Sequence, residues 1–384
     1  MAVRTGGVMI AEVQTRVQAL LEGLVERDVE RGLQVAAYLD GELVVDAWAG
    51  IADPSTGRPV DGETLFTVWS AGKSVAATVI HLLADRGLIA YDALIADYWP
   101  EFAANGKQAI TVRQALTHTS GIPQIPDGVS PAELLDWETM CRLVAELRPL
   151  WQPGSAMGYH AMTYGWIVGE LARRVDGRPF AEIVQQEICA PLAIDGLFFG
   201  IPDAVEPRVA VLEEAPVVVS TPAPAGDLSI QVAPPWRNPA YAWANRPEVR
   251  RACLPSSGAI MNARSLARHY AALACGTSDG VQLLTPERIR LASAVAFEGM
   301  DRVLGVRVRR ALGYHLGEPL SAMGERSSAF GHAGAGGTYG FADPQHRFAF
   351  ALTKNRMVDT SPGEGTAFLV AHEIRSVLSI PEAG

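Results

Sequence analysis

The stretch Val68-Trp69-Ser70-Ala71-Gly72-Lys73-Ser74 decides both the fold and the chemistry that this sequence predicts. The residues that follow, from Val75 to Leu83, are almost all apolar, and Gly87 ends the run, which predicts a buried helix. Ser70 and Lys73 are three residues apart and so share one face of its first turn. Burial lowers the pKa of an ammonium group, and a neutral amine can take the proton of a serine hydroxyl. The pattern therefore predicts a serine nucleophile with a lysine as its activating amine.

The Ser-x-x-Lys spacing also has a plain structural reading, in which the serine caps a helix and the lysine is solvated. About one such spacing is expected by chance in a chain of this length. The apolar helix argues against a solvated lysine, because a buried amine needs partners or must lose its proton. We therefore expect a second ionisable group close to Lys73.

Tyr159 is the best candidate for that group. It lies in Trp151-Gln152-Pro153-Gly154-Ser155-Ala156-Met157-Gly158-Tyr159-His160-Ala161, a Pro-Gly turn that leads into an apolar helix predicted from about Thr163 to Val175. A phenol held near an ammonium can act as a proton shuttle. The alternative is a core tyrosine whose hydroxyl bonds to the backbone.

A third segment near the C-terminus is rich in glycine: Phe330-Gly331-His332-Ala333-Gly334-Ala335-Gly336-Gly337-Thr338-Tyr339-Gly340. Small residues let backbone N–H groups approach a ligand closely, and an oxyanion needs such donors. A glycine-rich turn between strands is the simpler alternative.

In this order and at these separations, the three segments resemble the serine hydrolases of the class C β-lactamase and D-Ala-D-Ala carboxypeptidase superfamily. Within it, the chain looks most like the family VIII carboxylesterases. Ile110 to Gly121 and Pro255 to Gly258 add to the resemblance, which covers roughly Leu33 to Asn355. It implies an α+β fold of the β-lactamase and DD-peptidase type, forming a single catalytic domain.

Carried over by position, the resemblance makes Ser70 the nucleophile, Lys73 its activating amine and Tyr159 the proton shuttle toward the leaving group. The backbone N–H groups of Ser70 and Ala335 would form the oxyanion hole. The sequence does not assign the base for acylation, since Lys73 and Tyr159 interact strongly and titrate as a pair.

Two departures from the family pattern bear on the substrate. Penicillin-recognising members have Tyr-x-Asn where this chain has Tyr159-His160-Ala161, and they commonly have Lys-Thr-Gly where it has His332-Ala333-Gly334. Lysine there is a permanent cation, whereas histidine is mostly neutral at neutral pH. Both changes favour neutral esters over β-lactams or peptidoglycan, and we predict that His332 and Gly334 contact the substrate.

The two ends of the chain predict hairpins. Leu33 to Leu39 and Glu42 to Ala49 flank Asp40-Gly41, a strong two-residue turn signal. Thr338 to Ala342 and Arg347 to Thr353 form a second pair of apolar runs near the C-terminus. The simplest assembly pairs both hairpins in one antiparallel sheet.

We expect a helix from about Ile10 to Arg31 to cover this sheet, with a mainly helical subdomain inserted between the terminal strands. The predicted boundaries place the sheet subdomain at residues 1–66 and 299–384 and the helical subdomain at residues 67–298. The Ser70 helix then begins at the seam, where ligand clefts are common.

Residues 201 to 256 contain many prolines and resist a secondary-structure prediction. Long ordered loops are uncommon unless they cover a site. We hypothesise that Trp236, Tyr241 and Trp243 from this segment wall the substrate pocket. The alternative is a surface excursion packed for stability.

The composition indicates a soluble enzyme: 48% of the residues are hydrophobic, 19% are charged and the net charge is −10. No basic stripe for nucleic acid stands out, and Met1 to Arg16 lacks the apolar run of a secretory signal or membrane span. Cysteines at 141, 189, 253 and 275 have neither metal spacing nor the density of a disulfide scaffold. We read them as reduced thiols of a cytoplasmic protein.

The sequence therefore predicts a serine carboxylesterase that hydrolyses small to medium carboxylic esters through a Ser70 acyl-enzyme. An acyltransferase of natural-product metabolism is the first alternative, and a β-lactam or D-amino-acid amide hydrolase is the second. The non-enzymatic alternative is an inactive binding module with this fold. No metal or organic cofactor is expected, the predicted partner is a small-molecule ester, and no oligomeric state is indicated.

Overall fold

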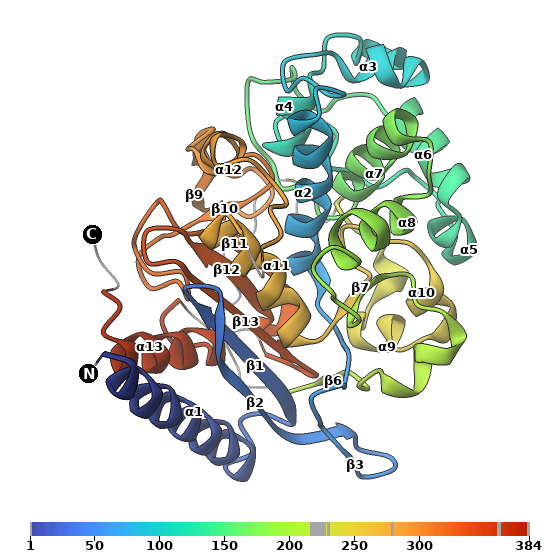
Figure 1. Cartoon of the computed structure of the whole chain (residues 1–384). Helices are drawn as coiled ribbons and strands as arrows, with labels where there is room; N and C mark the ends of the chain where they lie inside the picture. The colour runs from blue at the N-terminus through green and yellow to red at the C-terminus, as the bar shows by residue number, and fades with distance from the viewer. Residues whose placement is uncertain (1, 216–227, 229–230, 278–279, 359–361, 382–384) are drawn as a thin grey trace.

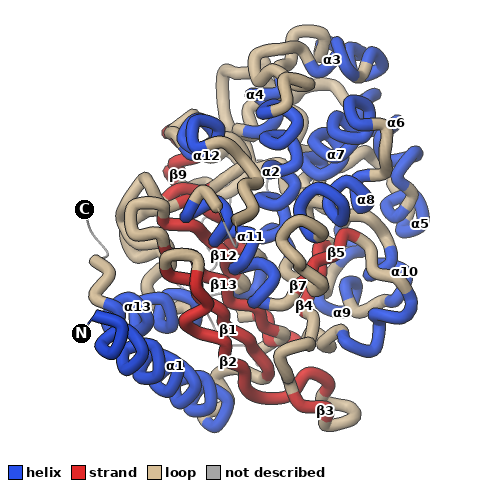
Figure 2. The backbone as a smooth tube through the Cα atoms, viewed as in Figure 1, coloured by secondary structure: helices blue, strands red, loops and turns tan. Residues whose placement is uncertain are grey.

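The structure is a computed structural model that describes residues 2–215, 228, 231–277, 280–358 and 362–381. A strand-rich part and a helix-rich part lie against each other (Figure 2). The strand-rich part contains both the first and the last strands of the chain, as the two predicted terminal hairpins require (Figure 1).

The large sheet, within the described residues, has nine strands in the order β3-β2-β1-β13-β12-β11-β10-β9-β8. Every neighbouring pair in it runs antiparallel. Its strands are β1 (Gly32–Leu39), β2 (Glu42–Asp53), β3 (Arg58–Pro59), β8 (Phe297–Met300), β9 (Arg307–Arg310), β10 (His315–Leu316), β11 (Phe330–Ala333), β12 (Tyr339–Asp343) and β13 (Phe348–Lys354).

The two terminal hairpins meet through β1 and β13, where Leu33 lies opposite Lys354 and Leu39 lies opposite Phe348. Asp40 and Gly41 adopt positive φ angles of 52° and 87°, as a tight turn between twisted strands requires. The predicted assembly of both hairpins in one antiparallel sheet is confirmed, and with it the α+β fold class.

Each face of the sheet packs against a different set of helices, because successive side chains of a strand point to opposite faces. Val35 of β1 and Phe350 of β13 join a core with α1 (Ala2–Glu26) and α13 (Thr366–Leu378). Ala36 and Ala351 join the other core, which contains α2 (Gly72–Asp85) and α11 (Ala263–Cys275). The sheet thus carries α2, and with it Ser70 and Lys73, on one face.

The remaining elements build the helix-rich part and its connections. All residues of α2 from Gly72 to Ala84 are buried, as its apolar sequence predicts. The other helices are α3 (Ile95–Tyr98), α4 (Val112–Leu116), α5 (Pro131–Leu135), α6 (Trp137–Glu146), α7 (Thr163–Asp176), α8 (Phe180–Val184), α9 (Ala240–Ala244), α10 (Pro247–Arg251) and α12 (Pro286–Ser293). Short strands outside the large sheet are β4 (Phe66–Thr67), β5 (Leu197–Phe199), β6 (Glu213–Glu214), β7 (Ala259–Met261) and β14 (Arg356–Met357).

The division at residues 66 and 299 stays a prediction. The helix α11 belongs by sequence to the middle section but packs against β1, β12 and β13 of the sheet. The described parts of residues 201 to 256 form only short elements, among them η4 (Asp203–Arg208) and η6 (Pro235–Arg237). Residues 216–227 and 229–230 of that segment lie outside the described residues.

Two histidines are fully buried in the core on the α2 side of the sheet. His81 bonds to the Tyr91 hydroxyl and to the Leu312 carbonyl, and His269 bonds to the Thr78 hydroxyl. Burial lowers the pKa of both imidazoles to about 3. Both therefore stay neutral in the folded protein over the range in which an exposed histidine becomes charged.

The buried histidines predict a loss of stability in mild acid. An unfolded histidine has a pKa of about 6.5, so the unfolded chain binds more protons once the pH falls below that value. Between about pH 6.5 and pH 5, each of the two should lower the free energy of unfolding by about 2 kcal/mol. Urea unfolding of the wild type at both pH values measures this loss. Burial also lowers the pKa values of His118, His160, His315 and His332, which add to the loss in the wild type. A His269→Gln variant should therefore lose about 2 kcal/mol less than the wild type, while His372→Gln, at an exposed position of α13, should lose as much as the wild type; equal losses in all three proteins would contradict the prediction.

Among the described residues, no helix combines the length and the apolar composition that crossing a bilayer requires.

Candidate active site

Ser70 lies in η1 (Trp69–Ala71), a short 3-10 turn that runs directly into α2. Trp69 has a φ of 53°, in the left-handed region that non-glycine residues rarely adopt. Strain of this kind persists where the surrounding structure enforces it, and it clusters at functional sites. The turn brings the chain from β4 into α2 with Ser70 at the junction.

Lys73 is fully buried on the first turn of α2. Its Nζ lies 3.0 Å from Ser70 Oγ, 2.9 Å from the Ala161 carbonyl oxygen and 2.8 Å from the Ser256 carbonyl oxygen. The two carbonyls accept two N–H bonds, so a neutral amine would direct its lone pair at the serine hydroxyl. The predicted neighbourhood of Ser70 and Lys73 is present, and Lys73 has no carboxylate partner among the described residues.

The aromatic ring of Tyr159 completes this group, with Lys73 Nζ 4.9 Å from the ring centroid. Burial lowers the pKa of Lys73 well below its usual range, and the positive charge of Arg237 lowers it further. Burial raises the pKa of the Tyr159 phenol, and a hydrogen bond with Ser70 offsets part of that rise. At neutral pH these directions favour an amine beside a protonated phenol.

Asp301 holds the backbone of Tyr159 in place. Its Oδ1 accepts hydrogen bonds from the N–H groups of Tyr159, Val303 and Leu304, at 3.1, 2.8 and 3.0 Å. The side chain is almost completely buried. Sequence reasoning missed Asp301, because it lies 142 residues from Tyr159 in a segment without a recognisable motif.

Two buried histidines, His118 and His160, pack next to Tyr159 and bond to the backbone around it. The backbone N–H of His160 donates to Nδ1 of His118, and Nε2 of His160 accepts from the N–H of Ile122. The rings of His118 and Tyr159 lie 5.0 Å apart, measured between their centroids. His118 is thus a hydrogen-bond acceptor for the backbone beside the site.

The glycine-rich segment passes directly behind the Ser70 turn. A Cβ atom on Gly334 would lie 2.2 Å from the Val68 carbonyl oxygen, so only glycine permits this approach. The next residues form η7 (Ala335–Gly337), in which Gly336 has a φ of 77°. This approach brings Ala335, the predicted second oxyanion donor, to the segment that carries Ser70.

His332 on β11 is buried and contacts the ring of His315, with 3.8 Å between the two centroids. Its Nδ1 donates to the Ala333 carbonyl oxygen at 2.6 Å, and its Nε2 has no partner among the described residues. Burial lowers the pKa of His332 well below its usual value. This direction favours a neutral ring at neutral pH, and the contact of His332 with substrate stays a prediction.

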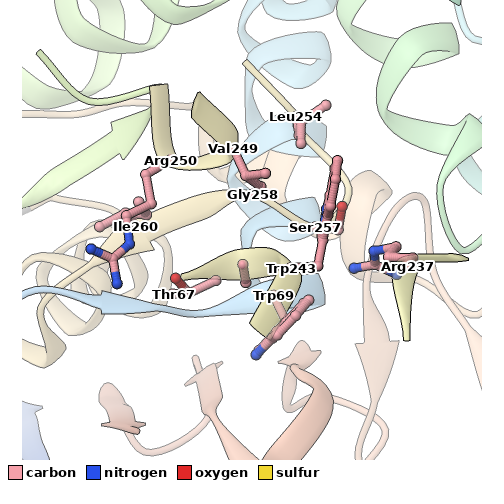
Figure 3. Close-up of a pocket in the computed structure, with 11 residues that line it drawn as sticks. Thr67, Trp69, Arg237, Trp243, Val249, Arg250, Leu254, Ser257, Gly258 and Ile260 are labelled. Carbon is pink, nitrogen blue, oxygen red and sulfur yellow. The ribbon is translucent and has the colours of Figure 1, made fainter. Parts of the chain in front are cut away.

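The three predicted wall aromatics lie at different distances from the Ser70 turn. Trp243 lines a small cavity with Trp69, Arg237, Ser257 and Gly258 (Figure 3). Tyr241 packs against the same apolar cluster as Trp69, while Trp236 is 37% exposed and donates to the Val129 carbonyl oxygen. The rings of Trp236 and Trp243 meet edge to face. Their contact with substrate stays a prediction.

Arg237 is a further residue that sequence reasoning missed. Its guanidinium lies over the Trp69 ring, 5.3 Å from the centroid. The same sequence segment had drawn attention only for its prolines and aromatics. Within the described part of the chain, no group of three or more His, Cys, Asp or Glu side chains is arranged to hold a metal ion.

A family model named Beta-lactamase matches residues 17–373, which is most of the chain. The chain belongs to the β-lactamase family. The resemblance drawn from the Ser70, Tyr159 and Gly334 segments is therefore confirmed.

Similar proteins within the β-lactamase family include esterases. The chain is 38% identical over 343 residues to Esterase/beta-lactamase LipL of Mycobacterium tuberculosis, covering 85% of this chain and 77% of LipL. A crystal structure of a family VIII carboxylesterase matches with a TM-score of 0.87 and 33% identity, covering 96% of this chain and 98% of that one. A penicillin-binding protein homologue from Caulobacter crescentus matches with a TM-score of 0.86 and 35% identity, covering 96% and 97%.

Proposed function

We propose that this protein is a serine carboxylesterase that hydrolyses small to medium carboxylic esters through an acyl-enzyme on Ser70. The observation that carries the proposal is the position of Lys73 Nζ, which touches two carbonyl oxygens and the Ser70 hydroxyl. An amine in that position is desolvated and faces the proton that it must remove. The similarity to LipL and to a family VIII carboxylesterase supports an ester as the substrate.

The reaction begins with attack of Ser70 Oγ on the ester carbonyl while its proton passes to Lys73. The opposite pKa shifts of Lys73 and Tyr159 favour Lys73 as this base and Tyr159 as the donor of a proton to the leaving alkoxide. The ammonium of Lys73 then returns the serine proton to the Tyr159 phenolate, so that both groups regain their starting states. The backbone N–H groups of Ser70 and Ala335 stabilise the oxyanion of the tetrahedral intermediate. Water then attacks the acyl-enzyme, and the carboxylic acid leaves.

The remaining site residues shape the pocket. His332 contributes a neutral ring to one wall of the pocket, and Gly334 lets the backbone of that wall come close to the Ser70 turn. The aromatic side chains form the other wall: Trp236, Tyr241 and Trp243. We also propose a cytoplasmic location, since all four cysteines are free thiols. Cell fractionation with activity as the readout would test the location.

The mass of the intact protein after brief exposure to p-nitrophenyl butyrate tests the proposed function. The wild type should gain one butyryl group transiently and release p-nitrophenol steadily, and Ser70→Ala should do neither. An adduct that persists in water but disappears when an alcohol or amine is added would assign the protein as an acyltransferase instead. Equal behaviour of the two proteins would overturn the serine hydrolase proposal and leave a binding module.

A further inference from the structure

Among the residues that the structure describes, no carboxylate pairs with Arg237. Its Nε is buried and has no hydrogen-bond partner among the described residues. Burial lowers the pKa of Arg237 to about 10, which still leaves the group charged at neutral pH. The side chain as a whole is half-buried, but a partly desolvated guanidinium without a carboxylate is unfavourable, so its presence needs an explanation.

A neighbouring arginine of the same cavity, Arg250, has a carboxylate partner, although its Nε also lacks a hydrogen bond within the described residues. Arg250 also lines the cavity in Figure 3, but its Nη1 lies 2.6 Å from Glu206, and it bonds to Asn245 and to the Ala210 carbonyl oxygen. Within the described chain, Arg237 by contrast has an aromatic partner, the Trp69 ring, but no carboxylate.

The location of Arg237 connects it with the chemistry. Trp69, on which the guanidinium lies, immediately precedes Ser70 in the chain. Arg237 and Ser257 line one cavity, and the carbonyl of the preceding Ser256 accepts the hydrogen bond from Lys73. An anion bound by Arg237 would thus lie beside the nucleophile and its base.

We propose that Arg237 is an anion-binding residue of the active site and that the preferred substrates are esters that carry a carboxylate. The inference rests on the proposed esterase function and deepens it. A guanidinium forms a planar fork of N–H donors that matches the two oxygens of a carboxylate. The neutral ring of His332 had favoured neutral esters, but Arg237 supplies a cation from another part of the chain.

The carboxylate can belong to the acyl part or to the alcohol part of the ester, and two pairs of substrates separate these sources. The acyl pair is mono-4-nitrophenyl glutarate and its neutral analogue 4-nitrophenyl pentanoate. The alcohol pair is 4-carboxyphenyl butyrate and neutral phenyl butyrate. The quantity measured is the ratio of kcat/KM for the anionic ester to kcat/KM for the neutral one. A ratio cancels any effect of the Arg237 charge on Lys73.

The variants are Arg237→Gln, Arg237→Lys and a matched control, Arg251→Gln. Arg251 belongs to the same segment, is 46% exposed in its side chain and pairs with Asp203 at the surface. Loss of a charge-assisted bidentate contact should lower the ratio about 10- to 100-fold in Arg237→Gln for one of the two pairs. Arg237→Lys should lower it less, and Arg251→Gln should match the wild type. A change below about twofold in Arg237→Gln for both pairs would overturn the inference, on the same scale of charge-assisted bonds.

A binding measurement that needs no turnover checks the same point. Glutarate should raise the melting temperature of the wild type, since a ligand that binds only the folded state stabilises it. It should leave Arg237→Gln unchanged, and an equal rise in both proteins would count against the subsite. If the wild type hydrolyses none of the four esters, the proposed function itself fails. If the wild type hydrolyses the neutral esters and the kcat/KM ratios are the same in the wild type and in Arg237→Gln, only the anion subsite fails.

Discussion

Replacing Ser70 with alanine or Lys73 with methionine is expected to lower kcat/KM for p-nitrophenyl butyrate by about 10⁴-fold in each case. Ser70→Ala removes the nucleophile, and Lys73→Met removes the group 3.0 Å from its oxygen that takes the proton. Because the two residues act as a unit, the double variant should be no slower than either single variant. Steady-state kinetics of the three variants measures this, with active-site titration of each preparation to exclude wild-type contamination.

Lys107 provides the matched control for Lys73. It is also a fully buried lysine, and its Nζ also donates to two backbone carbonyls, those of Ala104 and Leu147. Burial lowers its pKa to about 8. Lys107→Met should therefore reduce stability and leave kcat/KM within about threefold of the wild type, because it contacts no group of the site. A Lys73→Met variant that retained a tenth of the activity would rule out Lys73 as the base.

The second large effect concerns the buried ion pair between Lys354 at the end of β13 and Glu30 in the loop before β1. Their side chains are only 3% and 1% exposed, and the Thr366 hydroxyl at the start of α13 also donates to Glu30. Burial lowers the pKa of Lys354, and Glu30 offsets part of that shift. Lys354→Met would leave Glu30 buried without its counter-charge, and we expect a loss of about 3–5 kcal/mol in the free energy of unfolding.

Chemical denaturation of Lys354→Met, Glu30→Leu and the double variant measures this effect. The double variant should recover most of the lost stability, because it buries no charge. Arg142→Met is the control, since Arg142 pairs with Glu146 on the exposed face of α6 and should cost less than about 1 kcal/mol. A loss in Lys354→Met as small as in this control would show that Glu30 gains other partners or water when Lys354 is removed.

The sequence predicted the elements whose pattern is local. The apolar run after Lys73 predicted α2, and Asp40-Gly41 predicted the hairpin of β1 and β2. The small sheet of β4, β7 and β5 was beyond such reasoning, because its strands have only two or three residues and exist through pairing between distant segments. The predicted helix from Ile10 to Arg31 exists as α1, shifted toward the N-terminus.

The same distinction applies to the candidate site. Ser70 and Lys73 share one helical turn, so their contact follows from spacing, whereas Tyr159 was tied to them by the family resemblance. Asp301 and Arg237 are placed by tertiary contacts alone: Asp301 accepts three backbone N–H bonds, and Arg237 lies over Trp69 without a carboxylate partner among the described residues. Periodicity and motif spacing report only on neighbours along the chain. They therefore do not indicate residues such as Asp301 and Arg237, whose partners are set by the tertiary fold.

The pairing of β1 with β13 has a consequence for synthesis on the ribosome. One edge of β1 is covered only after the ribosome has synthesised β13, which pairs with it along Leu33 to Leu39. At about 5–20 residues per second, that delay lasts roughly 15–60 seconds. During this time β1 and β2 have only the earlier α1 to pack against, and one edge of β1 is open to other chains. We therefore expect nascent chains of this protein to need more protection from aggregation during elongation than a protein whose sheet closes early.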